Sequence, residues 1–118
     1  MKKTDVDIHE RIFRWVISCL KIVSQLPNDS LARVIKYQFA KAVTSVGAND
    51  QEANNSASRQ DFAAKYGIVK KELAESLYWL RIISNQYLGI NVDDQIKEGN
   101  ELLNIVSSII LSSKRSSS

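Results

Sequence analysis

Two groups of polar residues occur at helical spacing where an ordinary pair of helices would carry aliphatic side chains. The first group follows spacings of 4, 3 and 4 along the chain: Ser45, Asn49, Glu52 and Ser56. The second sets two carboxylates in an otherwise apolar stripe: Ile68, Glu72, Glu75, Trp79 and Ile82. Residues three and four apart share one face of a helix. Each stripe is therefore either a satisfied hydrogen-bond network or a functional site.

The carboxylates of Glu52, Glu72 and Glu75 would converge if their two helices pack side by side. Helical bundles build di-metal centres from inward-facing glutamates, but such centres also use Glu-x-x-His pairs, and this chain has only His9. General acid–base catalysis is conceivable, yet no partner nucleophile, oxyanion loop or phosphate-binding motif accompanies the carboxylates. We therefore expect no catalytic residue, metal ion, cofactor or small-molecule substrate.

A structural role is the favoured interpretation of the polar stripes. Asn49 can donate two hydrogen bonds and accept two. Opposite Glu52 and Glu75, it would satisfy carboxylates that are costly to bury alone. Polar residues in a helical seam also fix the register of the helices. We predict an interhelical polar network of Ser45, Asn49, Glu52, Glu72 and Glu75.

The first two helices that must position these residues are visible as apolar patterns. The first pattern alternates spacings of 4 and 3: Ile8, Ile12, Trp15, Cys19, Ile22 and Leu26. Pro27 ends it, and Asn28, Asp29 and Ser30 offer N-caps for a second helix over about 30–56. The predicted apolar face of the second helix is Leu31, Ile35, Phe39, Ala42 and Val46. Gly47, inside this helix, indicates a close neighbour or a slight bend.

Two further helices follow in the sequence. Ser58 is the predicted N-cap of the third, with Asp61 as its capping partner. Its seam is Phe62, Tyr66, Val69, Leu73, Ser76, Leu80 and Ile83. Together with the stripe from Ile68 to Ile82, this seam makes an arc wider than one neighbouring helix covers, so we expect contact with more than one element, another subunit included. Gly89 and Asn91 break the pattern, and Asp93 and Asp94 favour the first turn of a fourth helix.

Four helices with short connections and adjacent apolar faces predict an all-α fold, an antiparallel up-down-up-down four-helix bundle. A chain of 118 residues suffices for one domain with one core. We place that domain at residues 1–113. The tail over 114–118 has too little apolar content to pack, so we expect it to be disordered.

The sequence predicts a cytoplasmic protein without a membrane partner. No run approaches the roughly 18 to 20 apolar residues that a membrane span needs. The N-terminal MKKTDVDIHE has acidic residues where a signal peptide is apolar. The single Cys19 cannot form an internal disulfide, which agrees with a reducing compartment. At its seam position Cys19 is expected to be a buried hydrophobe rather than a catalytic thiol.

The net charge of +3 permits an acidic partner such as nucleic acid without demanding one. Candidate nucleic-acid contacts lie on the second and third helices: Arg33, Lys36, Lys41, Lys65, Lys70 and Lys71. The alternative is that these are solubilising charges, partly paired with acids three or four residues away. No sequence-reading motif is present, so any binding should be electrostatic and steeply dependent on salt.

Two segments resemble the four-helix-bundle family encoded in 23S rRNA intervening sequences. They are Val46-Gly47-Ala48-Asn49 followed by Glu52-Ala53, and the run Asp61-Phe62, Lys65, Ile68, Lys71-Glu72, Glu75, Tyr78-Trp79-Leu80. The resemblance covers about residues 26 to 84 and departs at Asp50-Gln51, where the family often has a basic or aromatic pair. This departure weakens any basic patch at that point.

The resemblance implies small bundles that assemble into rings, commonly pentamers, and that have no established enzymatic activity. A related branch, the accessory variability determinant proteins of diversity-generating retroelements, is basic and associates with nucleic acid and a reverse transcriptase. The chain is more similar to the branch from rRNA intervening sequences.

We therefore predict a non-enzymatic homopentamer that serves as a scaffold or accessory factor and binds RNA or DNA weakly. The alternative is a protein–protein adaptor ring with no nucleic-acid role. An enzyme using Glu52, Glu72 and Glu75 is the least favoured hypothesis. Nucleic-acid binding should collapse between low and moderate salt, whereas a hydrophobic client interface should not.

Overall fold

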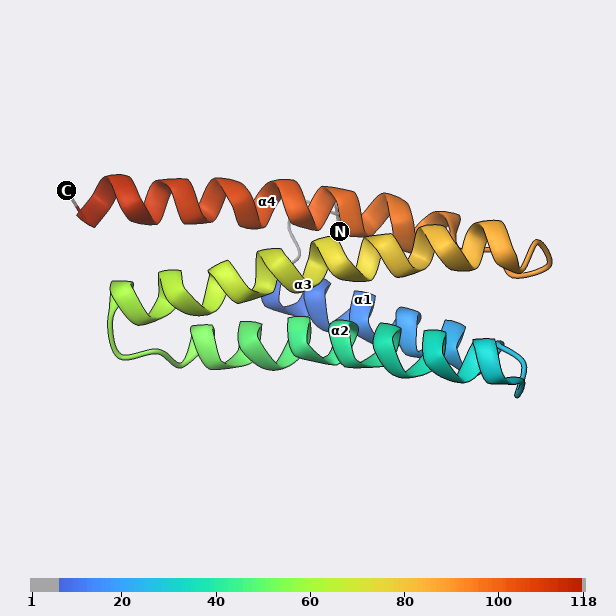
Figure 1. Ribbon diagram of the computed structural model, residues 1–118. Helices are drawn as coiled ribbons and strands as arrows, with labels where there is room; N and C mark the ends of the chain where they lie inside the picture. The colour runs from blue at the N-terminus through green and yellow to red at the C-terminus, as the bar shows by residue number, and fades with distance from the viewer. Residues whose placement is uncertain (1–6, 118) are drawn as a thin grey trace.

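The computed structural model describes residues 7–117, with side chains described up to Lys114. It contains four helices: α1 (Ile8–Val23), α2 (Ser30–Asn54), α3 (Arg59–Gln86) and α4 (Asp93–Ser117). Consecutive helices run in opposite directions, and α1 closes the bundle against α4 (Figure 1). The molecule is elongated, at 49 × 31 × 19 Å. The predicted all-α, antiparallel up-down-up-down bundle is confirmed.

Side-chain caps begin the first three helices. The Asp7 carboxylate accepts a hydrogen bond from the His9 amide at 2.7 Å, and the Asp29 carboxylate accepts one from the Ala32 amide at 2.9 Å. The Ser58 hydroxyl accepts one from the Asp61 amide at 3.1 Å. Each bond satisfies an amide that has no partner within its helix. The predicted caps Asp29 and Ser58 are therefore confirmed.

The core lies along the axis of the bundle and receives side chains from all four helices. Its largest fully buried members include Ile12, Phe39, Tyr66, Leu73, Leu80, Ile83 and Leu102. The placement of Leu31 on the buried face of α2 was wrong, because Leu31 is 51% exposed while Ala32 is fully buried. Ala32 continues the three- and four-residue spacing of Ile35 and Phe39, and one residue earlier the helix has turned by about 100°.

Gly47 has the close neighbour that its position in α2 indicated. A Cβ atom at this residue would lie 3.3 Å from Cγ2 of Val16 in α1. The missing side chain therefore lets α1 approach α2 closely beside their shared core.

The fourth helix continues farther than the predicted end of the domain at residue 113. Its backbone is helical to Ser117, so residues 114–117 of the predicted tail form its last turn. Residue 118 lies outside the described residues, and the domain boundary stays a prediction. Within the described part of the chain, no helix combines the length and apolar character needed to cross a membrane.

Candidate functional site

Ser45 and Asn49 bond to each other within α2. The Asn49 amide nitrogen donates to the Ser45 carbonyl at 2.9 Å and to the Ser45 hydroxyl at 3.1 Å. Both residues are half-buried. Among the described residues, no hydrogen bond joins Asn49 to Glu52 or Glu75. A polar side chain can form its hydrogen bonds with the preceding turn of its own helix. Asn49 does so, and it therefore makes no link to another helix here.

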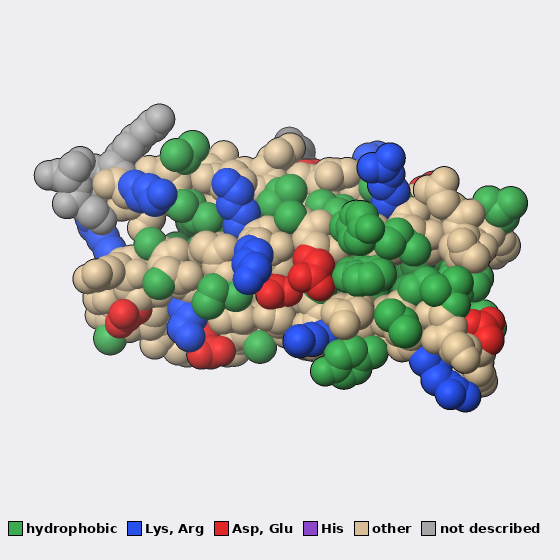
Figure 2. Space-filling model, viewed as in Figure 1, with side chains coloured by type: hydrophobic (Ala, Val, Ile, Leu, Met, Phe, Trp, Pro, Cys, Tyr) green, Lys and Arg blue, Asp and Glu red, His purple; other side chains and the backbone are tan. Residues whose placement is uncertain are grey.

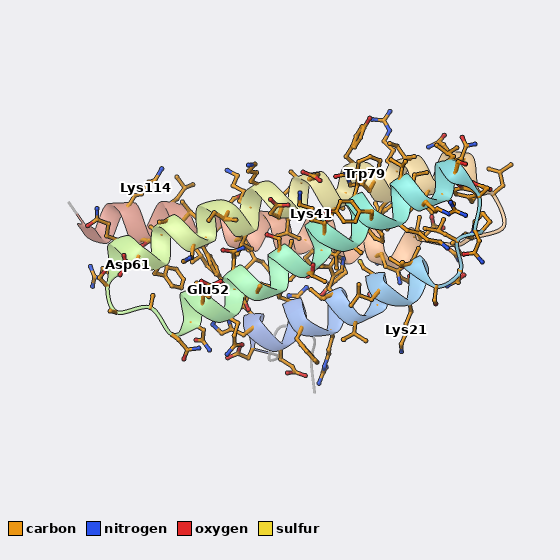
Figure 3. All side chains as sticks on the ribbon, turned by 60° about the horizontal axis from the view of Figure 1, so that its bottom comes forward. Lys21, Lys41, Glu52, Asp61, Trp79 and Lys114 are labelled. Carbon is orange, nitrogen blue, oxygen red and sulfur yellow. The ribbon has the colours of Figure 1, made fainter. Side chains whose placement is uncertain are left out.

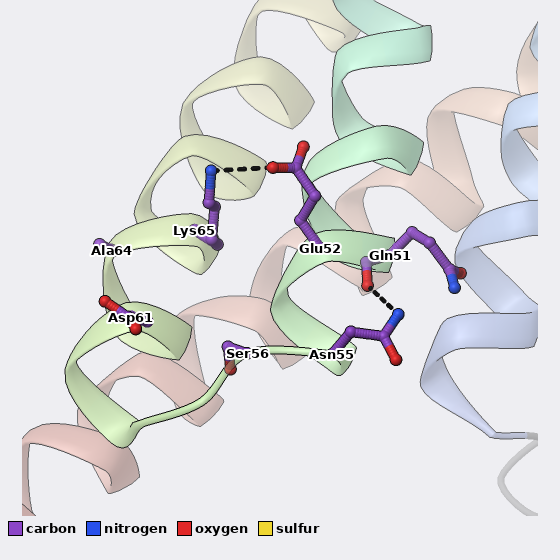
Figure 4. A pocket seen from close by; sticks show the side chains of 7 residues that line it. All are labelled: Gln51, Glu52, Asn55, Ser56, Asp61, Ala64 and Lys65. Atoms are coloured by element: carbon purple, nitrogen blue, oxygen red, sulfur yellow. Dashed lines mark hydrogen bonds and ion pairs between the residues drawn. The ribbon is translucent and has the colours of Figure 1, made fainter.

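Among the five residues of the predicted polar network, Glu52 forms an ion pair between α2 and α3. Its carboxylate lies 3.0 Å from the Lys65 ammonium group, with side-chain exposures of 57% and 37%. The pair lines an open cleft of about 440 Å³ between the end of α2 and the start of α3 (Figure 4). Asn55 closes the same end of α2 by donating to the Gln51 carbonyl at 3.0 Å. The cleft is open to solvent, and the Lys65 ammonium group in it is already paired with Glu52, while Asp61 adds a second carboxylate to the lining.

Glu72 and Glu75 lie on the flank of α3 that faces α2. They follow Lys65 at helical spacing, and both are half-buried. The Glu75 carboxylate accepts a hydrogen bond from the Trp79 indole at 3.2 Å. The Glu72 carbonyl accepts one from the Ser76 hydroxyl at 2.7 Å. Partial exposure leaves both carboxylates access to water, so neither needs an internal partner.

The buried network of the bundle is instead centred on Asp50. One oxygen of this 3%-exposed residue accepts a hydrogen bond from the Tyr66 hydroxyl at 2.7 Å and contacts Nδ1 of His9 at 2.8 Å. Burial raises the pKa of the Tyr66 phenol, and the bond to Asp50 raises it further. The phenol therefore stays protonated and donates. Three helices, α1, α2 and α3, meet at this single carboxylate.

The sequence itself contains a signal that Asp50 is buried. The predicted face of α2 ran through Phe39, Ala42 and Val46, and the next step of four residues reaches Asp50. Ala53, three residues later, is also buried. Continuing the apolar period would have placed Asp50 in the core.

A second buried polar cluster joins α1 to α4. The Arg11 guanidinium group is 7% exposed and lies 2.8 Å from the Glu98 carboxylate and 3.0 Å from that of Glu101. Hydrogen bonding to Glu98, opposed by burial and aided by Glu101, raises the pKa of Arg11. The Trp15 indole donates to the Gln95 carbonyl at 2.9 Å. These bonds hold the least extensive of the four helix–helix contacts.

Neither a reactive thiol nor a metal centre emerges from the described residues. Cys19 is fully buried, and burial raises its pKa to about 12. A thiol with this pKa is neutral at physiological pH and therefore a weak nucleophile. In the part of the chain that the structure describes, no three His, Cys, Asp or Glu side chains are placed to hold a metal ion.

The six candidate nucleic-acid contacts lie on different flanks of the bundle. Lys36 donates to Asn28 at 2.8 Å and, with Arg33 three residues earlier, occupies the α1 side of α2. Lys41 lies 5.9 Å from the centre of the Tyr37 ring on the outer surface of α2. Lys65 is paired with Glu52. The structure does not bring these residues into one patch.

Lys70 and Lys71 occupy a different part of the surface from the α2 cations. Both are exposed. Lys70 is seven residues before Leu77, whose side chain reaches α4 at Gly99, so Lys70 lies on the α4 side of α3. Lys71, one residue later, points outward.

An apolar surface runs along the junction of α2 and α3. We define the α2–α3 apolar face as Leu31, Val34, Ile68, Trp79 and Ile82, of which Ile68 is separated from Trp79 along α3 by Glu72 and Glu75. The first three are 51%, 56% and 38% exposed, and the last two are half-buried. Figure 2 shows hydrophobic side chains gathered over this part of the molecule, and Figure 3 labels Trp79 on α3 and Lys41 on α2.

A second apolar surface lies on α1. We define the α1 apolar ridge as Phe13, Ile17 and Leu20, of which Phe13 is 59% and Ile17 38% exposed. Phe13 borders a groove of about 310 Å³ between α1 and α2. Ile12, Val16, Gly47 and Ala48 form its apolar lining, and His9 and Asp50 lie at its edge. The single chain therefore leaves two separate apolar surfaces in water.

Comparison with known proteins agrees with this architecture. The model of a family described as 23S rRNA-intervening sequence protein matches residues 4–112. The chain is also similar to a crystal structure of a protein with unknown function, from the S23 ribosomal protein family of Bacteroides thetaiotaomicron VPI-5482. The two are 26% identical with a TM-score of 0.79, over 88% of this chain and 98% of the other. No curated protein matches the chain.

Proposed function

This chain belongs to the family of 23S rRNA-intervening sequence proteins, and from that premise we propose that it is a non-enzymatic subunit that assembles with copies of itself. The assembly, a ring of five in the cytoplasm, serves as a scaffold or accessory factor with weak electrostatic binding of nucleic acid. The five-fold state and the link to accessory variability determinant proteins come from the sequence resemblance and belong to this proposal.

The exposure of two apolar surfaces is the observation that carries self-assembly. Val34 and Phe13 are 56% and 59% exposed, on different flanks of the bundle. Exposed apolar side chains that adjoin one another mark interaction sites in soluble proteins. Burying them between subunits removes their apolar area from water, which is favourable by about 25 cal/mol per Å².

The separation of the two surfaces favours a ring over a two-fold dimer. A two-fold interface pairs one surface with itself, whereas a head-to-tail contact pairs two different surfaces and gives a ring when the rotation between subunits closes. Here the α2–α3 apolar face of one subunit would dock on the α1 apolar ridge and groove of the next. Repetition of this contact covers both surfaces in every subunit.

The nucleic-acid role rests on the net charge of +3 and on exposed lysines such as Lys70 and Lys71. A ring would repeat each cation in every subunit, so weak phosphate contacts would add through avidity. The second candidate function is an adaptor ring that binds a protein client and no nucleic acid. It is favoured by exposed apolar side chains outside the proposed ring contact, such as Leu111 on α4, which is 54% exposed.

Charge substitutions on the two surfaces test the ring. Val34→Glu and Phe13→Glu should each reduce the mass measured by light scattering, because each places a carboxylate in the apolar contact. Mixing the two variants should produce a heterodimer, since one intact face and one intact ridge remain. Asn104→Glu, an exposed site on α4, is the matched control and should keep the mass of the unaltered protein.

The results separate the models of assembly. A two-fold dimer through the α2–α3 apolar face would lose its mass with Val34→Glu alone and would keep it with Phe13→Glu. A monomeric unaltered protein would refute self-assembly altogether.

Salt dependence tests the nucleic-acid role. The mass of the unaltered protein should increase on addition of structured or single-stranded RNA at low salt and return to its initial value at moderate salt. Failure of any RNA or DNA to bind at low salt, with assembly intact, would leave the adaptor function.

A further inference from the structure

A shallow cavity on the outer surface between α3 and α4 combines an aromatic ring, a cation and an amide. Its volume is about 370 Å³, and it is lined by Ala74, Leu77, Tyr78, Arg81, Ile96 and Asn100. The floor is apolar, since Leu77 packs toward α4. The cavity borders the α2–α3 apolar face where Tyr78 contacts Trp79, but none of its six lining residues belongs to that face or to the α1 apolar ridge, so the proposed ring contact does not include them.

The Tyr78 ring is exposed but held in place. It is 58% exposed, and it contacts the ring of Trp79 edge-on, with centroids 5.5 Å apart and planes inclined by 68°. Trp79 is in turn fixed by its hydrogen bond to Glu75 at 3.2 Å. A braced aromatic ring at the surface loses little conformational entropy when a flat ligand stacks on it.

Arg81 and Asn100 supply the polar groups of the cavity. Among the described residues, no carboxylate pairs with Arg81. A guanidinium group without a partner is suited to a phosphate, with which it forms two parallel hydrogen bonds. The Asn100 amide both donates and accepts, as the edge of a nucleobase does.

Six of the seven acidic residues of α3 and α4 lie on flanks away from this cavity. Three lie on the α2 flank of α3: Asp61, Glu72 and Glu75. Three more lie on the α1 flank of α4: Asp94, Glu98 and Glu101. The exception is Asp93, which lies three residues before Ile96 and therefore shares the face of α4 that lines the cavity. Between these flanks, basic side chains therefore outnumber carboxylates.

Further cations extend the strip along both helices. Lys70 lies 11 residues before Arg81 on α3, or about 16 Å at 1.5 Å per residue. Lys97 follows Ile96 of the cavity, and Lys114 lies 18 residues, five helical turns, after Ile96. Figure 2 shows Lys and Arg side chains along α3 and α4 in this part of the molecule.

We propose that this cavity binds single-stranded nucleic acid, with one unpaired base stacked on Tyr78 and the adjoining phosphate held by Arg81. Asn100 contacts the edge of the base, and Lys70, Lys97 and Lys114 contact neighbouring phosphates. This inference rests on the nucleic-acid part of the proposed function and assigns it a site that shares only Lys70 with the six basic residues predicted from the sequence. A protein segment fits less well, because an apolar partner would bury Arg81 without a counter-charge.

Binding of a labelled ten-nucleotide oligomer to the full-length protein at low salt tests the site. Tyr78→Ala should weaken binding by about 5- to 100-fold, the range that stacking on one aromatic side chain provides. Tyr78→Phe should bind like the unaltered protein, since the ring remains. Arg81→Gln should reduce the slope of log K against log salt concentration by about one.

Tyr37→Ala is the matched control. Tyr37 is 64% exposed and has a lysine ammonium group 5.9 Å from its ring, but it lines no cavity on α3 or α4. Its removal should leave the affinity unchanged. An oligomer with abasic sites should bind the unaltered protein as weakly as the intact oligomer binds Tyr78→Ala. Equal affinity for RNA and DNA would mean that the site contacts only the base and the phosphate. A preference for RNA would indicate a further contact to the 2′-hydroxyl.

The outcomes distinguish this inference from the function on which it rests. If the unaltered protein binds and Tyr78→Ala and Tyr37→Ala both bind equally well, the stacking site is refuted while electrostatic binding stands. If no oligomer binds the unaltered protein at low salt, both are refuted. If light scattering shows that Tyr78→Ala changes the mass of the assembly, the Tyr78 side chain lies between subunits, and the site is also refuted.

Discussion

Two polar pairs lie near each other between α2 and α3, and only one of them is buried. Asp50 and Tyr66 form the first, with an oxygen–oxygen distance of 2.7 Å. Glu52 and Lys65 form the second, with a nitrogen–oxygen distance of 3.0 Å. Asp50 is 3% exposed, whereas the Glu52 side chain is 57% exposed. The two contacts are similarly short and join the same two helices, but only the exposed pair can exchange its partner for water when one residue is removed.

Water is the difference between the two pairs. If Lys65 is removed, the Glu52 carboxylate bonds to solvent, so the net contribution of the pair is small. If Asp50 is removed, the Tyr66 hydroxyl stays inside the core without an acceptor, which costs far more. The contact geometry alone does not reveal this. Burial decides which polar residues hold the bundle together.

The largest effect is expected from Asp50→Ala. The substitution leaves the buried Tyr66 hydroxyl unsatisfied and removes the acceptor for His9, so we expect a loss of about 3 kcal/mol in the free energy of unfolding. Urea denaturation would measure it. The double variant Asp50→Leu with Tyr66→Phe should recover most of the loss, because no buried polar group is then left alone. Equal losses in the single and double variants would contradict the network.

Alkaline pH provides the next largest effect. The folded pKa of Tyr66 is raised above its unfolded value, so the folded state keeps a proton that the unfolded chain releases above about pH 10. The stability from this group is complete below that pH and is lost above it, at up to about 1.4 kcal/mol per pH unit. Tyr66→Phe should therefore show a flatter decline than the unaltered protein in unfolding measured from pH 9 to 12.

An exposed tyrosine is the control for the pH measurement. Tyr37 is 64% exposed, and Tyr37→Phe should leave the alkaline slope unchanged. A slope equally flattened by both substitutions would mean that burial of Tyr66 is not its cause.

The smallest effect is expected at the exposed pair. Glu52→Gln should change the free energy of unfolding by less than about 1 kcal/mol, and the change should disappear in about 1 M salt. Glu10→Gln, which breaks the exposed Glu10–Arg14 pair at 3.2 Å, should behave alike. A loss at Glu52 as large as that at Asp50 would remove the distinction between the two pairs.

The cavity at Tyr78 and Arg81 could not be predicted from the sequence. The pattern shows that Tyr78 and Trp79 point about 100° apart, but it does not show which of them faces α4. That requires the rotation of α3 against its neighbours, which the contact of Leu77 with Gly99 reveals. The six basic residues chosen from the sequence were likewise all on two helices, while the structure distributes them over several flanks.

The sequence alone determined the four helices, their order and most of their first residues. Apolar residues at spacings of three and four, Pro27 between the first two helices, and Asp29 and Ser58 as caps act within a few residues of one another, so local patterns contain this information. The tertiary structure decided that Asp50 rather than Asn49 or Glu52 is buried and that Leu31 faces water. These outcomes depend on how each helix is rotated against neighbours distant in the chain, and a polar residue becomes structural only where those neighbours exclude water.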